Sequence, residues 1–399
     1  MAPSRTIVVA GAGIGGLTAA LALAANNFRV IVIEKAERLE EAGAGLQLSP
    51  NASRILIGLG LRERLSAHAL VPETISIMSV RHGGEICRLP LGEPAAPRDG
   101  APYWVLHRAD LQRALLDQVR DSPGIDLRLG TAFENAAAST DGVIVGLRAG
   151  TIFRQEAAWA LIGADGVWSA LRNQLFPNIQ PRFSGLIAWR GTIEASQLPR
   201  ELTAQTVQLW MGPDAHLVAY PMSGGQKINV VAIIPGSWNQ SGWSELGDVT
   251  EIRQQFAAAR WPDSARTMVN AIGSWRKWAL FTVPEMTPWH SGAMALLGDA
   301  AHAMLPFAAQ GAGMAIEDAA VLAQCLGDTT DDSASAALAR YTALRRARVA
   351  RVQRLAQQNG RIYHLKGAAA LARDLFIKAM GPRRMLARQD WIYDWRPEN

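Results

Sequence analysis

Three short segments of the chain carry glycines at spacings suited to holding phosphate groups. The first, residues 11–16, reads Gly-Ala-Gly-Ile-Gly-Gly, follows an apolar run and precedes a segment rich in Ala and Leu. This order predicts a strand, a tight turn and a helix, whose free N–H groups and positive end bind phosphate. We expect five residues of this turn to contact a nucleotide: Gly11, Gly13, Ile14, Gly15 and Gly16.

A carboxylate follows the next predicted strand. Residues 29–34 form a second apolar run, which completes a βαβ unit over residues 6–34. Glu34 ends that run, where a carboxylate accepts hydrogen bonds from an adenosine ribose, and Lys35 stands beside it. The unit predicts dinucleotide binding but fits NAD as well as FAD, and a glycine-rich packing turn is the structural alternative.

The late glycine motif distinguishes these two cofactors. An apolar run ends at Gly298 and Asp299, which places a carboxylate where the ribityl chain of a flavin would bind. After Pro306, the turn at residues 310–313 leads into a predicted helix, whose positive end would stabilise the negative charge of a reduced flavin. The alternative is a helix cap with packing glycines. We predict non-covalent FAD, bound here by Asp299, Pro306, Gly311, Gly313 and Met314.

The order of elements predicts an α/β fold with two lobes. We assign residues 1–75, 100–181 and 274–330 to a Rossmann-like lobe for FAD, with a hairpin at residues 125–129 and 143–147. Alternating strands and turns predict an inserted antiparallel sheet for the substrate, residues 76–99 and 182–273. Its strands are expected at residues 186–193, 207–211, 216–220 and 228–234, and residues 331–399 predict a helical C-terminal region.

Composition narrows the function classes. The chain has 399 residues, 49% of them hydrophobic, and a formal net charge of +5, which suits anionic small molecules better than nucleic acid. Cys87 and Cys325 provide no disulfide framework or metal-binding spacing, so we expect no metal and a reducing, cytoplasmic compartment. No run reaches the ~18 apolar residues that span a bilayer. The basic residues of one predicted helix are spread around it and predict a solvated surface: Arg340, Arg345, Arg346, Arg348, Arg351 and Arg354.

The motifs together resemble the class A FAD-dependent aromatic hydroxylases. Within that class the chain is similar to the branch of salicylate hydroxylase, 3-hydroxybenzoate 6-hydroxylase and 6-hydroxynicotinate 3-monooxygenase, and the resemblance covers nearly the whole sequence. It rests on residues 43–52, 107–112, 163–169 and 309–314, which read GAGLQLSPNA, HRADLQ, GADGVWS and AQGAGM.

The resemblance implies a glutathione-reductase-type FAD lobe like that of para-hydroxybenzoate hydroxylase. It implies that NADH or NADPH reduces the flavin and that O₂ forms a C4a-hydroperoxide, which hydroxylates a phenolic or hydroxypyridine-type acid. By the same similarity, Arg108 would contact the flavin ribityl or pyrophosphate region. Asp165 would serve both FAD and the visiting nicotinamide nucleotide.

The substrate side is expected on the inserted sheet. His216, Val218 and Tyr220 alternate along one predicted strand and so share a face. Relatives carry His and Tyr in a similar strand as phenol-activating groups, and a neutral imidazole suits a general base. A hydrogen-bonded pair on a half-buried sheet is the structural alternative. Arg190, on another strand, could pair with a substrate carboxylate or lie on the surface.

Three further residues are expected to bind substrate. Gln310 would hydrogen-bond a substrate hydroxyl, as in 3-hydroxybenzoate 6-hydroxylase. Phe307 stands where hydroxynicotinate and salicylate hydroxylases tend to have His, and Gln47 where the hydroxynicotinate type has His. These departures disfavour those two substrates and imply a more apolar pocket floor.

Two other functions stay open at this point. One is a flavin-dependent oxidase or dehydrogenase acting on a non-aromatic substrate, and the other is a non-catalytic flavin-binding sensor. The expected partners are a small aromatic substrate and O₂, without nucleic acid or membrane, in a monomer or homodimer.

Overall fold

A computed structural model describes residues 5–39, 45–91, 100–239, 242–257, 261–285, 287–328 and 333–397. Gly43 and Ala44 of one motif, and residues 92–99 of the predicted second lobe, therefore lie outside the described residues. The ends of the predicted C-terminal region, residues 331–332 and 398–399, do so as well.

A six-stranded sheet forms the centre of the first lobe. Its order is β18-β19-β11-β1-β2-β7, and every pair is parallel except β18 with β19. The central strands are almost fully buried, as a parallel sheet covered on both faces requires. The strands are β1 (Thr6–Ala10), β2 (Arg29–Glu34), β7 (Ile125–Leu129), β11 (Ala160–Gly163), β18 (His290–Ser291) and β19 (Met294–Leu296).

The helices of this lobe begin at the predicted motifs. α1 (Ile14–Ala25) follows the first glycine turn, and α9 (Gly311–Gly327) follows the last one and packs against α1. The other elements of the lobe are α2 (Pro50–Gly58), α3 (Arg62–Ser66), α4 (Arg108–Arg120), α5 (Ala170–Leu175), α8 (Asp299–His302), the short turn η5 (Pro306–Ala308), β3 (Gly45–Leu48) and β6 (Trp104–His107).

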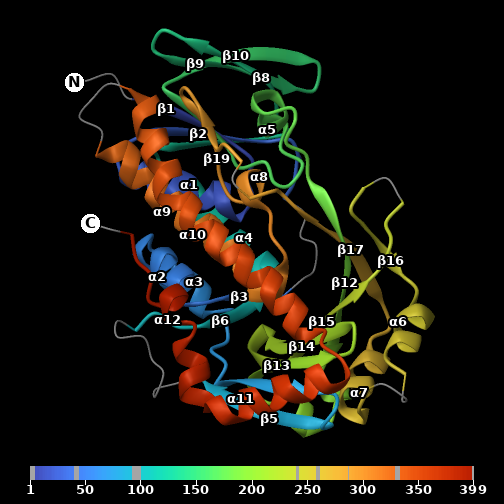
Figure 1. The fold of residues 1–399 in the computed structure, drawn as a ribbon. Helices are drawn as coiled ribbons and strands as arrows, with labels where there is room; N and C mark the ends of the chain where they lie inside the picture. Colours follow the sequence, from blue (N-terminus) through green and yellow to red (C-terminus); the bar gives the residue numbers. More distant parts are fainter. Residues whose placement is uncertain are drawn as a thin grey trace.

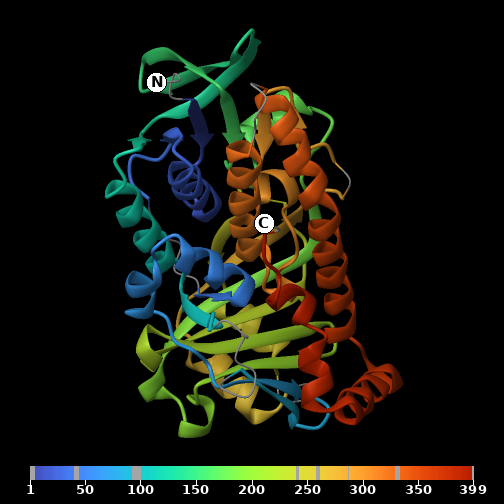
Figure 2. The ribbon, with the colours of Figure 1, turned by 90° about the vertical axis from the view of Figure 1, so that its left-hand side faces the viewer.

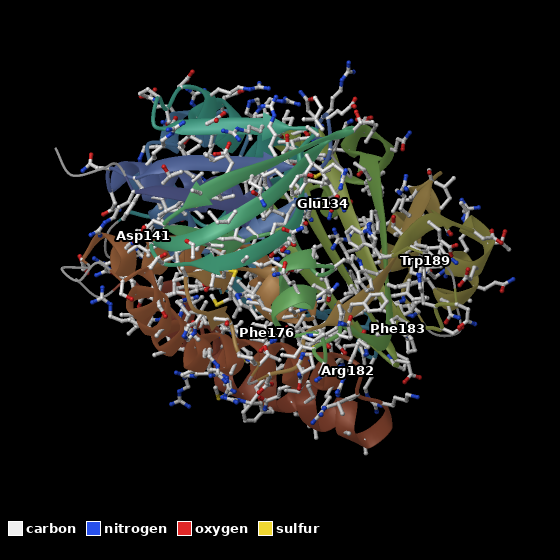
Figure 3. The ribbon with its side chains drawn as sticks, turned by 90° about the horizontal axis from the view of Figure 1, so that it is seen from above. Glu134, Asp141, Phe176, Arg182, Phe183 and Trp189 are labelled. Atoms are coloured by element: carbon white, nitrogen blue, oxygen red, sulfur yellow. The ribbon has the colours of Figure 1, made fainter. Side chains whose placement is uncertain are left out.

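The hairpin predicted at residues 125–129 and 143–147 is wrong. β7 joins the parallel sheet beside β2, whereas β9 (Gly142–Ala149) lies between β8 (Ala132–Ser139) and β10 (Ile152–Ala158) in a separate sheet. That sheet caps the lobe in Figure 1, and Figure 3 shows Glu134 and Asp141 on it. The alternation of apolar residues predicted both strands correctly, but such a pattern does not determine which strands pair with each other.

The second lobe is an eight-stranded sheet of order β16-β17-β12-β15-β14-β13-β4-β5. Its pairs are antiparallel except β4 with β13. The four predicted strands are confirmed as β12 (Arg182–Glu194), β13 (Thr206–Gly212), β14 (Ala215–Met222) and β15 (Lys227–Pro235). The others are β4 (Thr74–Ser79), β5 (Gly84–Pro90), β16 (Ser244–Gly247) and β17 (Trp275–Thr282).

The lobe boundary differs from the predicted one at two points. β17 pairs with β12, so the sheet extends beyond residue 273, and β4 begins two residues before residue 76. Figure 3 shows Arg182 and Phe183 where β12 leaves the first lobe and Trp189 farther along the strand.

α6 (Val249–Gln255) and α7 (Asp263–Ala271) cover this part of the sheet and share a core with Trp189 and Trp275. Short turns η2 (Ala195–Gln197), η3 (Arg200–Leu202) and η4 (Ser223–Gly225) connect its strands.

The C-terminal region is helical, as predicted, within the described residues. α10 (Ala334–Tyr363) runs along one side of both lobes, as Figures 1 and 2 show. α11 (Gly367–Ala387) packs on β5, and α12 (Asp390–Tyr393) returns to α2. No helix among the described residues combines the length and apolar character needed to cross a bilayer.

Candidate active site

A cavity of about 330 Å³ lies where the two lobes meet. The first lobe contributes all three glycine motifs to its wall, and β12, β14 and β15 of the second lobe close the other side. Among the predicted site residues, those that line this cavity are Gly13, Ile14, Gly15, Gln47, Arg108, Arg190, His216, Tyr220, Asp299, Pro306 and Gly311. Eleven residues dispersed over the sequence are thus brought to one place.

The glycines of the first motif have two separate roles. A Cβ on Gly16 would lie 1.9 Å from the carbonyl oxygen of Gly11, and a Cβ on Gly11 would lie 2.4 Å from that of Ala164. These two residues permit close packing and do not line the cavity. A Cβ on Gly13, by contrast, would meet no atom within 4 Å. Gly13 therefore leaves space in front of α1, whose N-terminus has no capping side chain and no acidic residue.

The late motif presents a second uncapped helix end. Gly311 and Ala312 of α9 line the cavity, and a Cβ on Gly311 would also meet nothing within 4 Å. α9 has neither a capping side chain nor an acid in its first turn. Gly313 and Met314 do not line the cavity, and Met314 is fully buried in the core. Their contact with cofactor stays a prediction.

Two charged side chains at this cavity have no protein partner among the described residues. Asp299 is exposed at the start of α8, and its side chain makes no capping hydrogen bond. The structure therefore does not support its role as a helix cap. Arg108, the first residue of α4, lines the same cavity. Both groups are available to a ligand.

Two of the other predicted cofactor residues, Glu34 and Asp165, already accept hydrogen bonds from the backbone. Glu34 accepts hydrogen bonds from the N–H groups of Ala12 and Ala36, both at 3.0 Å, and so fixes the first glycine turn. Lys35 is exposed. Asp165 uses Oδ2 to accept the N–H of Ala170 at 2.7 Å, while its Oδ1 is buried without a partner in the described chain. Burial raises the pKa of Asp165.

These features fit FAD. Gly13 leaves room for a pyrophosphate before one helix end, Asp299 and Arg108 are unpaired, and α9 points a second positive end into the same cavity. Bound at this place, FAD would lie between the first lobe and the face of the sheet that carries His216.

The second lobe contributes the predicted polar pair. His216, Val218 and Tyr220 all line the cavity from β14, which confirms that they share a face. His216 and Tyr220 are 2% and 3% exposed, and no hydrogen bond joins them. His216 instead bonds through Nδ1 to Nε2 of His364, 2.8 Å away, which leaves Nε2 as the ring nitrogen without a partner in the described chain.

Burial sets the protonation of this pair. It lowers the pKa of His216 well below its ordinary 6.5, with a smaller contribution from His364. Burial raises the pKa of Tyr220, against the smaller opposing influence of Arg190. At neutral pH His216 is therefore a neutral proton acceptor and Tyr220 a neutral hydrogen-bond donor.

Arg190 is a cation facing the cavity from β12. Its guanidinium lies 5.2 Å from the ring centre of Trp278, and its Nε is buried without a hydrogen-bond partner. None of the described carboxylates pairs with it, and burial lowers its pKa. An anionic ligand would complete this site, because a buried unpaired charge is costly.

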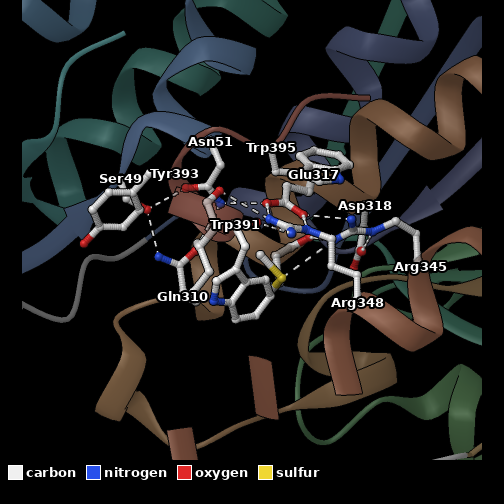
Figure 4. A network of polar contacts seen from close by, with 12 residues as sticks. Ser49, Asn51, Gln310, Glu317, Asp318, Arg345, Arg348, Trp391, Tyr393 and Trp395 are labelled. Carbon is white, nitrogen blue, oxygen red and sulfur yellow. Dashed lines mark hydrogen bonds and ion pairs between the residues drawn. The ribbon is translucent and has the colours of Figure 1, made fainter. Parts of the chain in front are cut away.

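Gln310 lies differently from the prediction. Its Nε2 donates to Ser49 at 2.7 Å, and its Oε1 accepts from Asn51 at 3.1 Å, so the amide points away from the cavity. Asn51 also donates to Glu317 at 2.7 Å, which connects Gln310 to a buried network of charged residues (Figure 4).

The prediction that the arginines of α10 lie on a solvated surface is wrong for Arg345 and Arg348, which take part in the network. Arg345 is 1% exposed and pairs with Glu317 and Asp318, both at 2.7 Å. Arg348 binds Glu317 and the carbonyl of Trp391. Two buried acids of α9 thus determine which face of α10 turns inward.

A larger cavity of about 980 Å³ adjoins the first, and its walls include Gln47, His216 and Pro306 from the first one. β4, β13 and the C-terminal helices supply a mostly apolar lining. Phe307 belongs to this second cavity, with its ring centre 5.0 Å from that of His216. The predicted apolar pocket floor thus lies beside the polar pair.

Sequence patterns missed two polar partners of the site. His364 is 148 residues from the His216 that it contacts, and Tyr103, just before β6, donates to Gln47 at 2.6 Å. The Tyr-His pair at residues 363–364 stands at the end of a long predicted helix, but nothing in the sequence assigns it to the sheet.

The comparisons with known proteins agree with this geometry. Residues 4–356 match the FAD binding domain family. The 3-amino-4-hydroxybenzoate 2-monooxygenase PtmB3 of Streptomyces platensis is 37% identical over 97% of this chain and 95% of its own length. The 3-hydroxybenzoate 6-hydroxylase of Polaromonas naphthalenivorans is 33% identical over 98% and 96%. Klebsiella pneumoniae HpxO, solved with FAD and uric acid, superposes with a TM-score of 0.83 at 25% identity, covering 96% of this chain and 95% of that one. The chain therefore belongs to the class A FAD-dependent aromatic hydroxylases and is an FAD-dependent aromatic monooxygenase.

Proposed function

We propose that this monooxygenase hydroxylates a phenolic aromatic acid whose carboxylate pairs with Arg190 and whose ring hydroxyl lies between His216 and Tyr220. The observation that carries the proposal is Arg190 itself. It is a cation with a buried, unpartnered Nε, in the same cavity as a neutral base and a neutral donor. A single-ring acid with a hydroxyl group offers complementary groups to all three side chains.

Each residue has a defined part in this mechanism. Bound FAD, reduced by NAD(P)H, supplies the activation of O₂. Arg190 orients the acid through its carboxylate. Nε2 of His216 accepts the phenol proton, and the hydroxyl of Tyr220 donates to the resulting phenolate oxygen. Removing this proton raises the electron density of the ring, which favours attack by an electrophilic oxygen.

The relatives support an aromatic acid as substrate. The two named above act on a hydroxybenzoate and an aminohydroxybenzoate, which both carry a carboxylate and a phenol. Phe307 and the apolar cavity beside it disfavour hydroxynicotinate and salicylate, whose hydroxylases tend to have His in place of Phe307.

The test is a substrate panel with the FAD-loaded protein. NADH and NADPH oxidation, O₂ uptake and product mass are measured with hydroxybenzoates, aminohydroxybenzoates and hydroxypyridine carboxylates. We expect a phenolic acid to stimulate NAD(P)H oxidation and to gain one oxygen atom. Oxidation that yields only peroxide with every acid would support the oxidase alternative, and no NAD(P)H oxidation at all would support the sensor.

The cellular setting belongs to the same proposal. Cys87 and Cys325 are buried and form no disulfide, which suits a reducing cytoplasm, where NAD(P)H is available. We propose a monomer or homodimer, which light scattering of the purified holoenzyme would distinguish.

A further inference from the structure

We propose that His364 is the second member of a proton relay that carries the phenol proton from His216 out of the active site. The inference rests on the proposed function, because the relay needs a phenolic ligand beside His216. His364 comes from the end of α10, far along the chain from the sheet that holds the rest of the site.

Geometry supports transfer between the two rings. Nδ1 of His216 and Nε2 of His364 are 2.8 Å apart, a normal hydrogen-bond distance, and the ring planes are tilted by 38°. Among the described residues, His364 is the only hydrogen-bond partner of His216. A proton taken up at Nε2 of His216 thus has one protein acceptor to which the ring can pass a proton from its other nitrogen.

Aromatic rings enclose His216, whereas His364 is partly exposed to solvent. The rings of Phe307 and Tyr363 pack around His216, with centres 5.0 and 5.4 Å away. His364 is half-buried, and it lies near an ion pair of Asp214 with Lys366 at the surface. The N–H of Asp214 donates to the carbonyl of His364 at 3.4 Å, which ties the end of α10 to the turn between β13 and β14.

Charged groups on the described elements around His364 include Asp214 on that turn and Lys366 before α11. They also include Arg373 of α11, whose Nη1 donates to the carbonyl of Tyr363 at 3.2 Å. Burial lowers the pKa of His364 to about 4, and the carboxylate of Asp214 partly opposes that effect. Neither imidazole retains an added proton at neutral pH, so both can pass it on.

The proton balance closes over the two rings. The phenol O–H bond breaks and a proton binds Nε2 of His216, whose Nδ1 proton moves to Nε2 of His364. The Nδ1 proton of His364 then passes to solvent water. Both rings end neutral, each with its proton on the nitrogen opposite to the starting one. No oxidant or reductant is needed.

The experiment follows proton release in the oxidised holoenzyme without NAD(P)H. A stopped-flow mix with 3-hydroxybenzoate in weakly buffered phenol red reports the rate, while flavin absorbance reports binding. His364→Gln retains hydrogen-bonding groups but does not carry a proton at neutral pH. We expect unchanged binding and proton release at least tenfold slower. His290→Gln is the matched control, because His290 lies on β18 and bonds Thr342 instead. It should release protons at the unmodified rate.

A second variant guards against a purely structural effect. In His364→Ala, added imidazole should restore the rate of proton release in proportion to its concentration, and N-methylimidazole should restore less. Equal rates in His364→Gln and the unmodified protein, or a slow His364→Ala that imidazole does not restore, would overturn the relay. Binding without proton release in the unmodified protein would overturn the relay alone. Absence of any binding across the panel of phenolic acids would instead contradict the proposed function on which the relay rests.

Discussion

Arg348 binds Glu317 through two parallel hydrogen bonds, Nε to Oε2 and Nη2 to Oε1, each 2.7 Å long. Glu317 is fully buried, and the same Oε1 accepts a hydrogen bond from Asn51, the neighbour of Gln310. Arg348 also donates to the carbonyl of Trp391. The pair therefore connects the C-terminal chain to α9, the helix that begins at the cavity proposed to hold FAD (Figure 4).

Loss of this arginine should destabilise the protein strongly. Arg348→Leu removes one of the two arginine partners of the buried Glu317. Breaking a buried pair costs about 3–5 kcal/mol, and because Arg345 stays on Glu317 we expect the lower end of that range. The free energy of unfolding from urea titration measures the loss. Arg354→Leu is the control on the same helix, since its pair with Glu285 is exposed and should change stability by about 1 kcal/mol or less. Similar losses in both variants would contradict a special role for the buried pair.

Two glycines of the first motif should respond differently to a side chain. Gly13→Val places atoms in open space before α1, so FAD affinity should fall at least tenfold, about 1.4 kcal/mol, with an unchanged melting temperature of the FAD-free protein. Gly16→Ala meets the carbonyl of Gly11 at 1.9 Å and should lower the unfolding free energy itself by about 1–3 kcal/mol. Flavin-fluorescence titration and thermal melts distinguish the two effects. If Gly13→Val binds FAD normally, the pyrophosphate lies elsewhere.

Arg190 should discriminate acids from uncharged analogues. Arg190→Met removes the proposed partner of the carboxylate, which should weaken binding of a hydroxybenzoate by about 2 kcal/mol or more, roughly thirtyfold in Kd. The matching hydroxybenzamide should bind the variant and the unmodified protein alike. Arg182→Met, an exposed arginine on the same strand, serves as control. If Arg190→Met leaves the Kd of the acid unchanged, Arg190 does not bind the substrate carboxylate.

Tyr220 should matter more for turnover than for binding. Tyr220→Phe keeps the ring but removes the donor to a phenolate oxygen, so kcat should fall about 10²-fold while KM changes little. Steady-state NAD(P)H oxidation coupled to product analysis measures both. Tyr341→Phe loses a comparable buried hydroxyl in the other lobe and should retain kcat. Unimpaired coupled turnover in Tyr220→Phe would leave that hydroxyl with a structural role only.

Stability should fall as pH is lowered below about 6.5. Burial lowers the pKa of His364 to about 4 and that of His216 in the same direction. Between these pKa values and 6.5, the unfolded chain binds protons that the folded chain does not. The free energy of unfolding therefore decreases as the pH falls through this range. Urea midpoints from pH 7 to pH 4 should show this slope, and it should be shallower in His364→Gln. An equal slope in both proteins would contradict the burial of the pair.

Local patterns predicted most of what lies within one segment. The βαβ unit, strands β12 to β15 and the shared face of His216 and Tyr220 follow from periodicity and turn residues, and the structure confirms them. Partners across the fold could not be predicted in this way. β7 pairs with β2 and not with β9. Arg345 points inward because it forms ion pairs with Glu317 and Asp318 of α9. His364 reaches the site only because α10 runs the length of both lobes.

The order of the cavity walls along the chain has a consequence for biosynthesis. The residues that line the cavity proposed to hold FAD run from Gly13 to Ala315, and the buried pair between Glu317 and Arg348 needs α10 as well. A nascent chain on the ribosome therefore lacks the complete site until most of it has been translated. We therefore expect FAD to bind only once most of the chain has been made, and we expect a riboflavin supplement during expression to raise the fraction of protein that contains flavin.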